Sequence, residues 1–170
     1  MSNLEYLEHP ISPFFDENST ILILGSFPSV LSRKSNFYYG HPQNRFWKVL
    51  KEVFHDTLPT TIDEKKAFLK RHHIALWDVI ATCKIKGSAD QSIQDVTCND
   101  ISLILKQAPI KHIYVNGQTA FKLYQKYTYQ TIKKEAILLP STSPANAAYR
   151  VSDLVEKWLI VKESEHEYSI

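Results

Sequence analysis

Aromatic side chains stand inside a polar stretch of this chain, where packing alone is a weak explanation for them. The stretch contains two short motifs, Gly25-Ser26-Phe27-Pro28-Ser29 and Phe37-Tyr38-Tyr39-Gly40-His41-Pro42-Gln43-Asn44-Arg45-Phe46-Trp47. Aromatic rings in a polar cleft are suited to stacking on a nucleobase. An aromatic minicore beneath a long loop would produce the same pattern, so the pattern alone leaves both interpretations open.

Other polar residues interrupt or follow four short apolar runs, which cover residues 20–24, 74–80, 112–115 and 137–139. These polar residues are Gly25 to Pro28, Asp78, Asn116 with Gly117, and Ser141 to Pro144. An apolar run without alternation is typical of a strand buried on both faces in a parallel sheet. In an open α/β sheet, ligands bind outside the carboxyl ends of the strands. We therefore expect these polar segments to meet at one edge of a sheet.

Helical spacing of apolar residues separates the expected strands. Helices are predicted over residues 45–54, 62–72, 101–105, 119–127 and 151–159, and residues 26–43 are predicted to form a long loop. Asn99 or Asp100 is expected to cap the third helix. Strands that alternate with helices imply parallel pairing through right-handed crossovers. The predicted fold class is α/β: a single three-layer domain over residues 1–170 with a central, mostly parallel four-stranded sheet flanked by helices. Its core is expected at about 20–160, with a polar C-terminal tail at about 162–170.

Composition excludes several classes of protein. The 170 residues include 44% hydrophobic and 22% charged residues with a net charge of +2, which does not indicate a strongly basic surface. No apolar run could span a bilayer and the N-terminus does not resemble a secretory signal, so we expect a cytoplasmic protein. Cys83 and Cys98 are too few for a four-thiolate site, and the adjacent His72 and His73 do not share a helix face. Dinucleotide, P-loop and nucleophile-elbow motifs are missing, and we expect no metal and no cofactor.

Three segments together resemble the uracil-DNA glycosylase superfamily. Residues Gly25 to Trp47 are similar to its mismatch-specific branch, which carries a GINPG-type motif followed at the same spacing by a phenylalanine and HPxNRFW. The chain resembles the hypoxanthine-DNA (deoxyinosine) glycosylase branch when the first motif, Gly25-Ser26-Phe27-Pro28-Ser29, is combined with two later segments. These segments are Leu76-Trp77-Asp78-Val79-Ile80 and Leu139-Pro140-Ser141-Thr142-Ser143-Pro144-Ala145-Asn146. The resemblance extends from about Ile21 to Trp158. It implies a DNA repair enzyme that removes a deaminated base.

One position departs from the related branches. The middle of the first motif is a catalytic Asn in the mismatch-specific branch and an Asp in the main uracil branch, whereas here it is Phe27. A phenylalanine can neither orient nor activate water. The resemblance implies that the catalytic role passes to Asn44, whose amide oxygen is expected to accept a hydrogen bond from the attacking water.

The resemblance also implies a set of base contacts. Tyr39 aligns with the phenylalanine that stacks on the flipped base, and the turn formed by Gly25, Ser26, Phe27 and Pro28 is expected to receive charge on the base. Asp78 accepts only, so it would favour the N1–H of hypoxanthine over the bare N1 of adenine. Asn116 is a second candidate contact. A helix cap or salt bridge for Asp78, and a turn role for Asn116, remain open alternatives.

The segment after the last strand is similar to the family motif that contacts the DNA backbone. We expect phosphate contacts from Ser141, Thr142, Ser143, Pro144 and Asn146, aided by a helix N-terminus beginning near Asn146. Tyr149 or Arg150 would fill the gap left by the flipped base, and we favour Arg150. The expected partner is double-stranded DNA containing a deaminated base, bound by a monomer with no obligate protein partner.

The leading hypothesis is a monofunctional DNA N-glycosylase that removes hypoxanthine, with uracil or mismatched bases as a close variant. Because Phe27 replaces the usual catalytic group, a catalytically inactive DNA-binding member of the same fold is one alternative. A small-molecule nucleoside- or base-binding protein is the other, and the modest net charge favours it. Salt-dependent DNA affinity separates the last two, because phosphate contacts require it.

Overall fold

The computed structural model of the chain describes residues 4–87 and 89–166. Four strands form the central sheet: β2 (Ile21–Gly25), β3 (Ile74–Asp78), β6 (His112–Asn116) and β7 (Ile137–Leu139). Their order is β3-β2-β6-β7, and every neighbouring pair is parallel. All residues of β2 and β3 are buried, as the unbroken apolar runs predicted. The predicted four-stranded sheet is confirmed, and it is parallel throughout.

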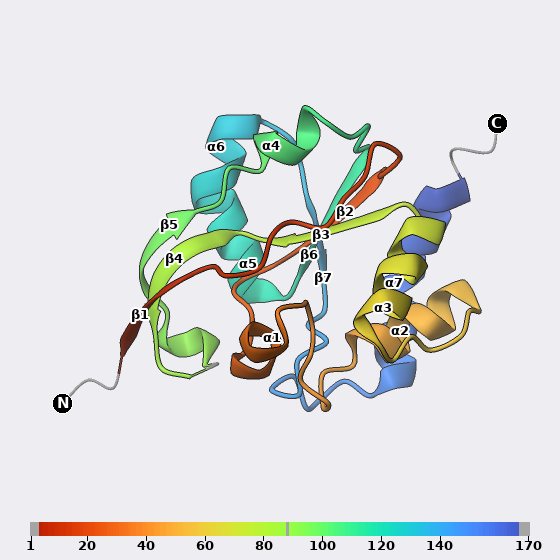
Figure 1. Cartoon of the computed structure of the whole chain (residues 1–170), viewed down its shortest axis with the longest axis horizontal. Coiled ribbons are helices and arrows are strands. Elements are labelled where there is room, and N and C mark those ends of the chain that lie inside the picture. The colour runs from red at the N-terminus through yellow and green to blue at the C-terminus, as the bar shows by residue number, and fades with distance from the viewer. Residues whose placement is uncertain (1–3, 88, 167–170) are drawn as a thin grey trace.

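Helices lie on both sides of this sheet (Figure 1). One side carries α2 (Phe46–Phe54), α3 (Ile62–Arg71) and α7 (Val151–His166), and the other carries α4 (Ser102–Leu105), α5 (Gln118–Leu123) and α6 (Tyr129–Ile132). A π-helical turn, Tyr124–Thr128, joins α5 to α6, so the helix predicted over 119–127 runs further than expected. Because α7 continues to His166, the first part of the predicted tail is helical, and residues 167–170 lie outside the described residues.

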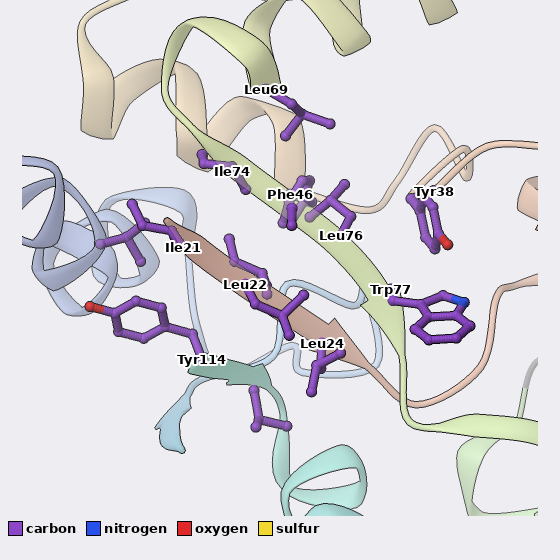
Figure 2. Packing of buried hydrophobic residues seen from close by; sticks show 14 of the residues in the cluster. Ile21, Leu22, Leu24, Tyr38, Phe46, Leu69, Ile74, Leu76, Trp77 and Tyr114 are labelled. Atoms are coloured by element: carbon purple, nitrogen blue, oxygen red, sulfur yellow. The ribbon is translucent and has the colours of Figure 1, made fainter. Parts of the chain in front are cut away.

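The main core lies between the sheet and α2, α3 and α7. Figure 2 shows side chains of β2 and β3 packed beside Phe46 of α2 and Leu69 of α3. The apolar stripe of α2 is buried along its whole length. The predicted cap of this helix by Asn99 or Asp100 is wrong, because Ile101 is the N-cap residue of α4; Asp100 Oδ1 nevertheless accepts from the Ser102 N–H at 3.1 Å. Among the described residues, no helix combines the length and the apolar character that a membrane span requires.

A second sheet was not predicted. Its strands β1 (Glu5–Glu8), β4 (Ile80–Ile85) and β5 (Gln94–Cys98) are antiparallel in the order β1-β4-β5. The strand expected over 74–80 ends at Asp78, and the chain passes directly into β4. The predicted loop over 26–43 also contains a helix, α1 (Val30–Ser35), capped by Ser29, whose hydroxyl accepts from the Ser32 N–H. A short 3-10 turn, Asp90–Ser92, precedes β5.

The C-terminal ends of α2 and α3 are joined through Asp56. Its carboxylate lies 2.8 Å from His72 Nε2 and 3.0 Å from Arg71 Nη2. The His72 ring stacks on Phe54, with 4.3 Å between ring centroids. The hydrogen bond to His72, aided by the Thr57 N–H and by Arg71, lowers the pKa of Asp56 to about 2. His72, the first histidine of the His72-His73 pair, therefore has a structural role as the partner of Asp56.

Replacing Asp56 by asparagine is expected to destabilise the protein at neutral pH and to have little effect in acid. A lowered folded-state pKa contributes stability above the unfolded value, and this contribution is lost as pH falls from about 4 to about 2. The side chain is partly exposed, so after solvent screening the loss at pH 7 should be about 1 kcal/mol. Urea unfolding of Asp56→Asn and of the exposed control Glu17→Gln at pH 7 and pH 3 measures it. A gap to wild type that does not shrink in acid would contradict the assignment.

Candidate active site

The predicted polar segments meet around one cavity of about 900 Å³ at the carboxyl edge of the central sheet. Strand register explains the meeting, since Gly25 pairs with Asp78 across β2 and β3, and Asn116 pairs with Leu139 across β6 and β7. The cavity wall includes every predicted site residue except Arg150: Gly25, Ser26, Phe27, Pro28, Tyr39, Asn44, Asp78, Asn116, Ser141, Thr142, Ser143, Pro144 and Asn146.

A chain of hydrogen bonds links three cavity residues, Asn116, Thr142 and Asn44. The Thr142 N–H donates to Asn116 Oδ1 at 3.1 Å, and Asn116 Nδ2 donates to Thr142 Oγ1 at 3.0 Å. The Thr142 hydroxyl then donates to Asn44 Oδ1 at 2.9 Å, and the Phe46 N–H donates to the same oxygen at 3.0 Å. Because a backbone N–H can only donate, these two N–H groups fix which atom of each amide is oxygen.

Asn44 therefore offers its amide nitrogen to the cavity. Its Oδ1 already accepts two hydrogen bonds, which occupies both lone pairs of a carbonyl oxygen. This corrects the expectation that the amide oxygen accepts a hydrogen bond from water. In the described part of the chain no acceptor is bonded to Asn44 Nδ2, so its N–H groups can donate to a bound molecule.

The same chain of hydrogen bonds changes the interpretation of Thr142. Its side chain is fully buried, its hydroxyl is used by Asn44 and Asn116, and its carbonyl accepts from the Arg45 N–H. The polar groups of Thr142 are thus used within the protein, and a phosphate contact by this residue stays a prediction. Asn116 lines the cavity, and its amide oxygen and one N–H hold Thr142.

Arg45 is a site residue that the sequence interpretation missed. Its guanidinium donates to four backbone carbonyl oxygens, those of Thr142, Ser143, Asn146 and Tyr149. The Ser143 and Asn146 contacts measure 2.7 and 3.0 Å. A planar fork with five N–H donors is suited to gathering several carbonyls in one loop. Arg45 thus shapes the whole 142–149 segment from the base of α2.

Asp78 ends β3 with its side chain buried beside the cavity. Its Oδ2 lies 2.7 Å from His9 Nε2, and both side chains are about 5% exposed or less. Its Oδ1 stands so close to Gly25 that a Cβ at that position would be 2.5 Å away. Asp78 thus has a buried side-chain partner, a histidine that the sequence interpretation did not consider. Within residues 4–87 and 89–166, no group of three or more His, Cys, Asp or Glu side chains is placed to hold a metal ion.

Four phenylalanine and tyrosine residues form part of the cavity wall: Phe27, Tyr38, Tyr39 and Tyr149. The Tyr39 ring stacks on Phe46 with 3.9 Å between centroids and 16° between planes, and its backbone has a φ of 54°, a strained region for a tyrosine. Phe27 packs into a small core with Ile80, Cys83 and Ile85 beneath the second sheet. Burial, and then the nearby Asp78 carboxylate, raises the pKa of Tyr38 far above its usual value. Tyr38 is therefore a neutral phenol that donates to the Ser12 carbonyl at 2.9 Å.

The end of the predicted DNA-contacting segment differs from expectation. The helix expected to begin near Asn146 begins at Val151, after turns that Arg45 holds. Asp153 occupies its first turn and accepts from the Arg150 N–H at 2.9 Å. The predicted helix start near Asn146 is therefore wrong, and the aid of a helix N-terminus to phosphate binding stays a prediction. The Arg150 side chain is 83% exposed and lies outside the cavity wall.

Comparison with known proteins places the chain in a family. The model of the Uracil DNA glycosylase superfamily matches residues 12–163, which include all the residues that line it. The chain belongs to this superfamily. Together with the relatives described below, this match indicates a DNA N-glycosylase, a hydrolase of N-glycosyl bonds.

Curated relatives in this superfamily share more than the fold. A hypoxanthine DNA glycosylase from Methanosarcina acetivorans is 37% identical over 139 residues, which cover 79% of this chain and 85% of the relative. A hypoxanthine DNA glycosylase from Methanosarcina barkeri is 39% identical over 108 residues, covering 62% of this chain and 68% of the relative. The predicted resemblance to the hypoxanthine-DNA glycosylase branch is confirmed.

A solved structure agrees with the fold. The solution NMR structure of a candidate uracil DNA glycosylase from Methanosarcina acetivorans superposes with a TM-score of 0.80 at 31% identity. The superposition covers 95% of this chain and all of that one. The layered arrangement described above is thus the arrangement found in this glycosylase superfamily.

Proposed function

We propose that the chain hydrolyses the N-glycosyl bond of hypoxanthine in double-stranded DNA and leaves an abasic site. The observation that carries this proposal is Asp78, a buried carboxylate at the cavity with Oδ1 beside Gly25. The two relatives named hypoxanthine DNA glycosylase support the same substrate.

Asp78 distinguishes bases at an atom that deamination changes. A carboxylate only accepts, so the N1–H of hypoxanthine can donate to it, whereas the bare N1 of adenine would face it acceptor to acceptor. Leaving two such groups unpaired in a cavity is a strong basis for rejection. Uracil has an equivalent N3–H and guanine an N1–H, so cavity shape and the ease of flipping must separate these from hypoxanthine.

The remaining cavity residues supply the chemistry. One face of Tyr39 is covered by Phe46, so its opposite face is the surface on which a flipped base would stack. The C1′–N9 bond breaks through an oxocarbenium-like sugar, the water oxygen bonds to C1′, and a water proton ends on the base. Asn44 Nδ2 donates to the negative charge that develops on the departing base, helped by backbone N–H groups of the Gly25–Ser29 turn.

DNA is held by a local edge and not by a strongly basic surface, since the net charge is only +2. Ser141, Ser143, Pro144 and Asn146 line the cavity at the end of the molecule that also carries α1, and are placed to contact the phosphates that flank the flipped nucleotide. The exposed Arg150 would fill the gap in the stack. The chain acts as a monomer in the cytoplasm, on DNA that contains a deaminated base.

Single-turnover cleavage of labelled duplexes tests the function. Duplexes with one inosine, one uracil or no modified base are incubated with excess protein and then cleaved with alkali. We expect strand breaks at inosine and none in the unmodified duplex. Salt-dependent DNA binding without strand breaks would favour a non-catalytic DNA-binding member. This alternative is considered because Phe27 replaces the usual catalytic residue of the first motif. If the protein shows no salt-dependent affinity for DNA, a nucleoside-binding protein is favoured instead.

Replacing Gly25 by alanine is expected to lower inosine cleavage by about 100-fold and to destabilise the fold by about 1–3 kcal/mol. The added methyl group would stand 2.5 Å from Asp78 Oδ1 and 3.2 Å from the Tyr39 hydroxyl, so the buried carboxylate must move. Single-turnover rates are compared with those of Gly87→Ala, where the methyl group meets open space and the φ of 61° strains the backbone away from the cavity, so this control reports a destabilised protein with an unchanged site. A Gly25→Ala rate equal to wild type would show that the Asp78 position does not matter for cleavage.

A further inference from the structure

The His9 side chain is 4% exposed and contacts Asp78, and no feature of the motifs assigns it a role. Its Nε2 lies 2.7 Å from Asp78 Oδ2, whereas His9 itself does not line the cavity. We propose that His9 is a positioning residue that holds Asp78 as a carboxylate acceptor for the N–H edge of the flipped base. This inference rests on the proposed function and names the residue that sets its base selectivity.

The fold brings His9 to this place through two separate pairings. Just before it, β1 pairs with β4, and the His9 N–H itself donates to the Ala81 carbonyl at 2.6 Å. Just after it, Phe14 forms an antiparallel bridge with Leu76 of β3. Residues 9–13 therefore run alongside the crossing from β3 to β4, where Asp78 ends its strand. The contact joins residues that are 69 positions apart in the sequence.

The tautomer of His9 follows from its neighbours. The Ile11 N–H donates to His9 Nδ1 at 3.3 Å, so Nδ1 is an acceptor and carries no proton. The ring proton of a neutral histidine is then on Nε2, where it donates to Asp78. A second proton on Nδ1 would face the Ile11 N–H donor to donor. The backbone thus directs the Nε2–H of His9 at the carboxylate.

The packing around His9 holds the ring in this orientation. Phe27 meets it edge to face at 5.7 Å between centroids, and Tyr38 lies at 6.2 Å. Phe27 is the residue that replaces the catalytic group of the related branches. Its ring here packs against the histidine that contacts Asp78.

Because His9 contacts Oδ2 of Asp78, the other carboxylate oxygen, Oδ1, is the one beside Gly25 at the cavity wall. Asn99 fixes the same turn from below, because its Nδ2 donates to the Asp78 carbonyl at 2.9 Å. With both backbone and side chain held, the carboxylate cannot turn away from a base that offers an N–H. A carboxylate placed in advance binds such a base without first having to be ordered.

A double-mutant cycle on inosine cleavage tests the proposal. His9→Ala should lower kcat/KM by about 10- to 100-fold, the range for losing a hydrogen bond to a charged group. In an Asp78→Ala background the same change should cost less than about twofold, because a residue that acts through Asp78 has nothing left to hold. His9→Gln should recover most of the loss, since its amide can donate to Asp78 and accept from Ile11. The control His55→Gln, an exposed histidine that ends α2, should match wild type.

Equal losses from His9→Ala in both backgrounds, or no loss in either, would overturn the proposal. If His9→Ala does not fold, His9→Gln and the histidine tautomer seen in long-range ¹H–¹⁵N spectra of the wild type decide it. We expect the ring proton on Nε2, and a ring protonated on Nδ1 with a bare Nε2 would contradict the inference. If the wild type fails to cleave the inosine duplex, the proposed function fails, while the tautomer still tests the contact between His9 and Asp78.

Discussion

Asn44→Asp is expected to lose as much cleavage as Asn44→Ala, about 10²- to 10³-fold in single-turnover rate, the usual cost of removing one preorganised donor. Aspartate has the shape of asparagine, and one of its oxygens can still accept from Phe46 and Thr142. The other oxygen then replaces Nδ2 at the cavity. A donor becomes an acceptor with negative charge, which repels the anion forming on the departing base.

This pair of variants separates two mechanisms. If Asn44 acted through an oxygen that accepts from water, a carboxylate would serve as well or better, as the Asp of the main uracil branch does. Cleavage by Asn44→Asp well above that of Asn44→Ala would therefore contradict the donor role. Saturating protein removes differences in DNA affinity from the measured rate. Asn36→Asp, at the exposed end of α1, adds the same charge away from the cavity and serves as the control.

The central sheet was predictable because each of its strands corresponds to a short, mainly apolar run in the sequence. Burial on both faces requires such runs, and parallel pairing brings their polar ends to one edge. The residues of the cavity wall can then be predicted from the strand ends alone, without any knowledge of distances. This is why Asp78, Asn116 and the Ser141–Asn146 segment were correctly placed together.

The second sheet was not predictable on the same basis. Its outer strands, β1 and β5, are mostly exposed and carry charged or polar residues, so neither shows an apolar run. The β4–β5 pairing also contains register shifts, and Asp95 in β5 has a φ of 53°. These strands are held by the backbone ladder and by a few inward residues, a pattern that resembles a polar loop in the sequence.

Roles inside the cavity were less predictable than membership of it. Residue types show that Asn44 can donate and accept, but only its neighbours decide which atom faces the cavity. His9 shares no motif with Asp78 and reaches it through strand pairing far along the chain. Arg45 stands within a recognised motif, yet its four carbonyl partners lie about 100 residues away.

Arg45→Met is expected to abolish measurable cleavage and to lower the free energy of unfolding by about 2–4 kcal/mol, because four carbonyls lose their donor together. Without the hydrogen bonds from Arg45, the segment that carries Thr142 is no longer held in place. Asn44 Oδ1 then loses the Thr142 hydroxyl, one of its two donors. Catalysis and stability should therefore fall together, unlike in Asn44→Ala, where stability should change far less.

Arg45→Lys distinguishes charge from shape. A lysine keeps the positive charge near the cavity but has no planar fork, so it can satisfy only part of the carbonyl set. We expect it to recover little of the cleavage, measured as single-turnover rate beside urea unfolding, with the exposed Lys48→Met as control for loss of a charge on α2. Recovery of wild-type cleavage by Arg45→Lys would show that the charge matters and the shaping of the 142–149 segment does not. The four-carbonyl geometry predicts the opposite, because no single ammonium group can lie in hydrogen-bond range of carbonyls spread over eight residues of one loop.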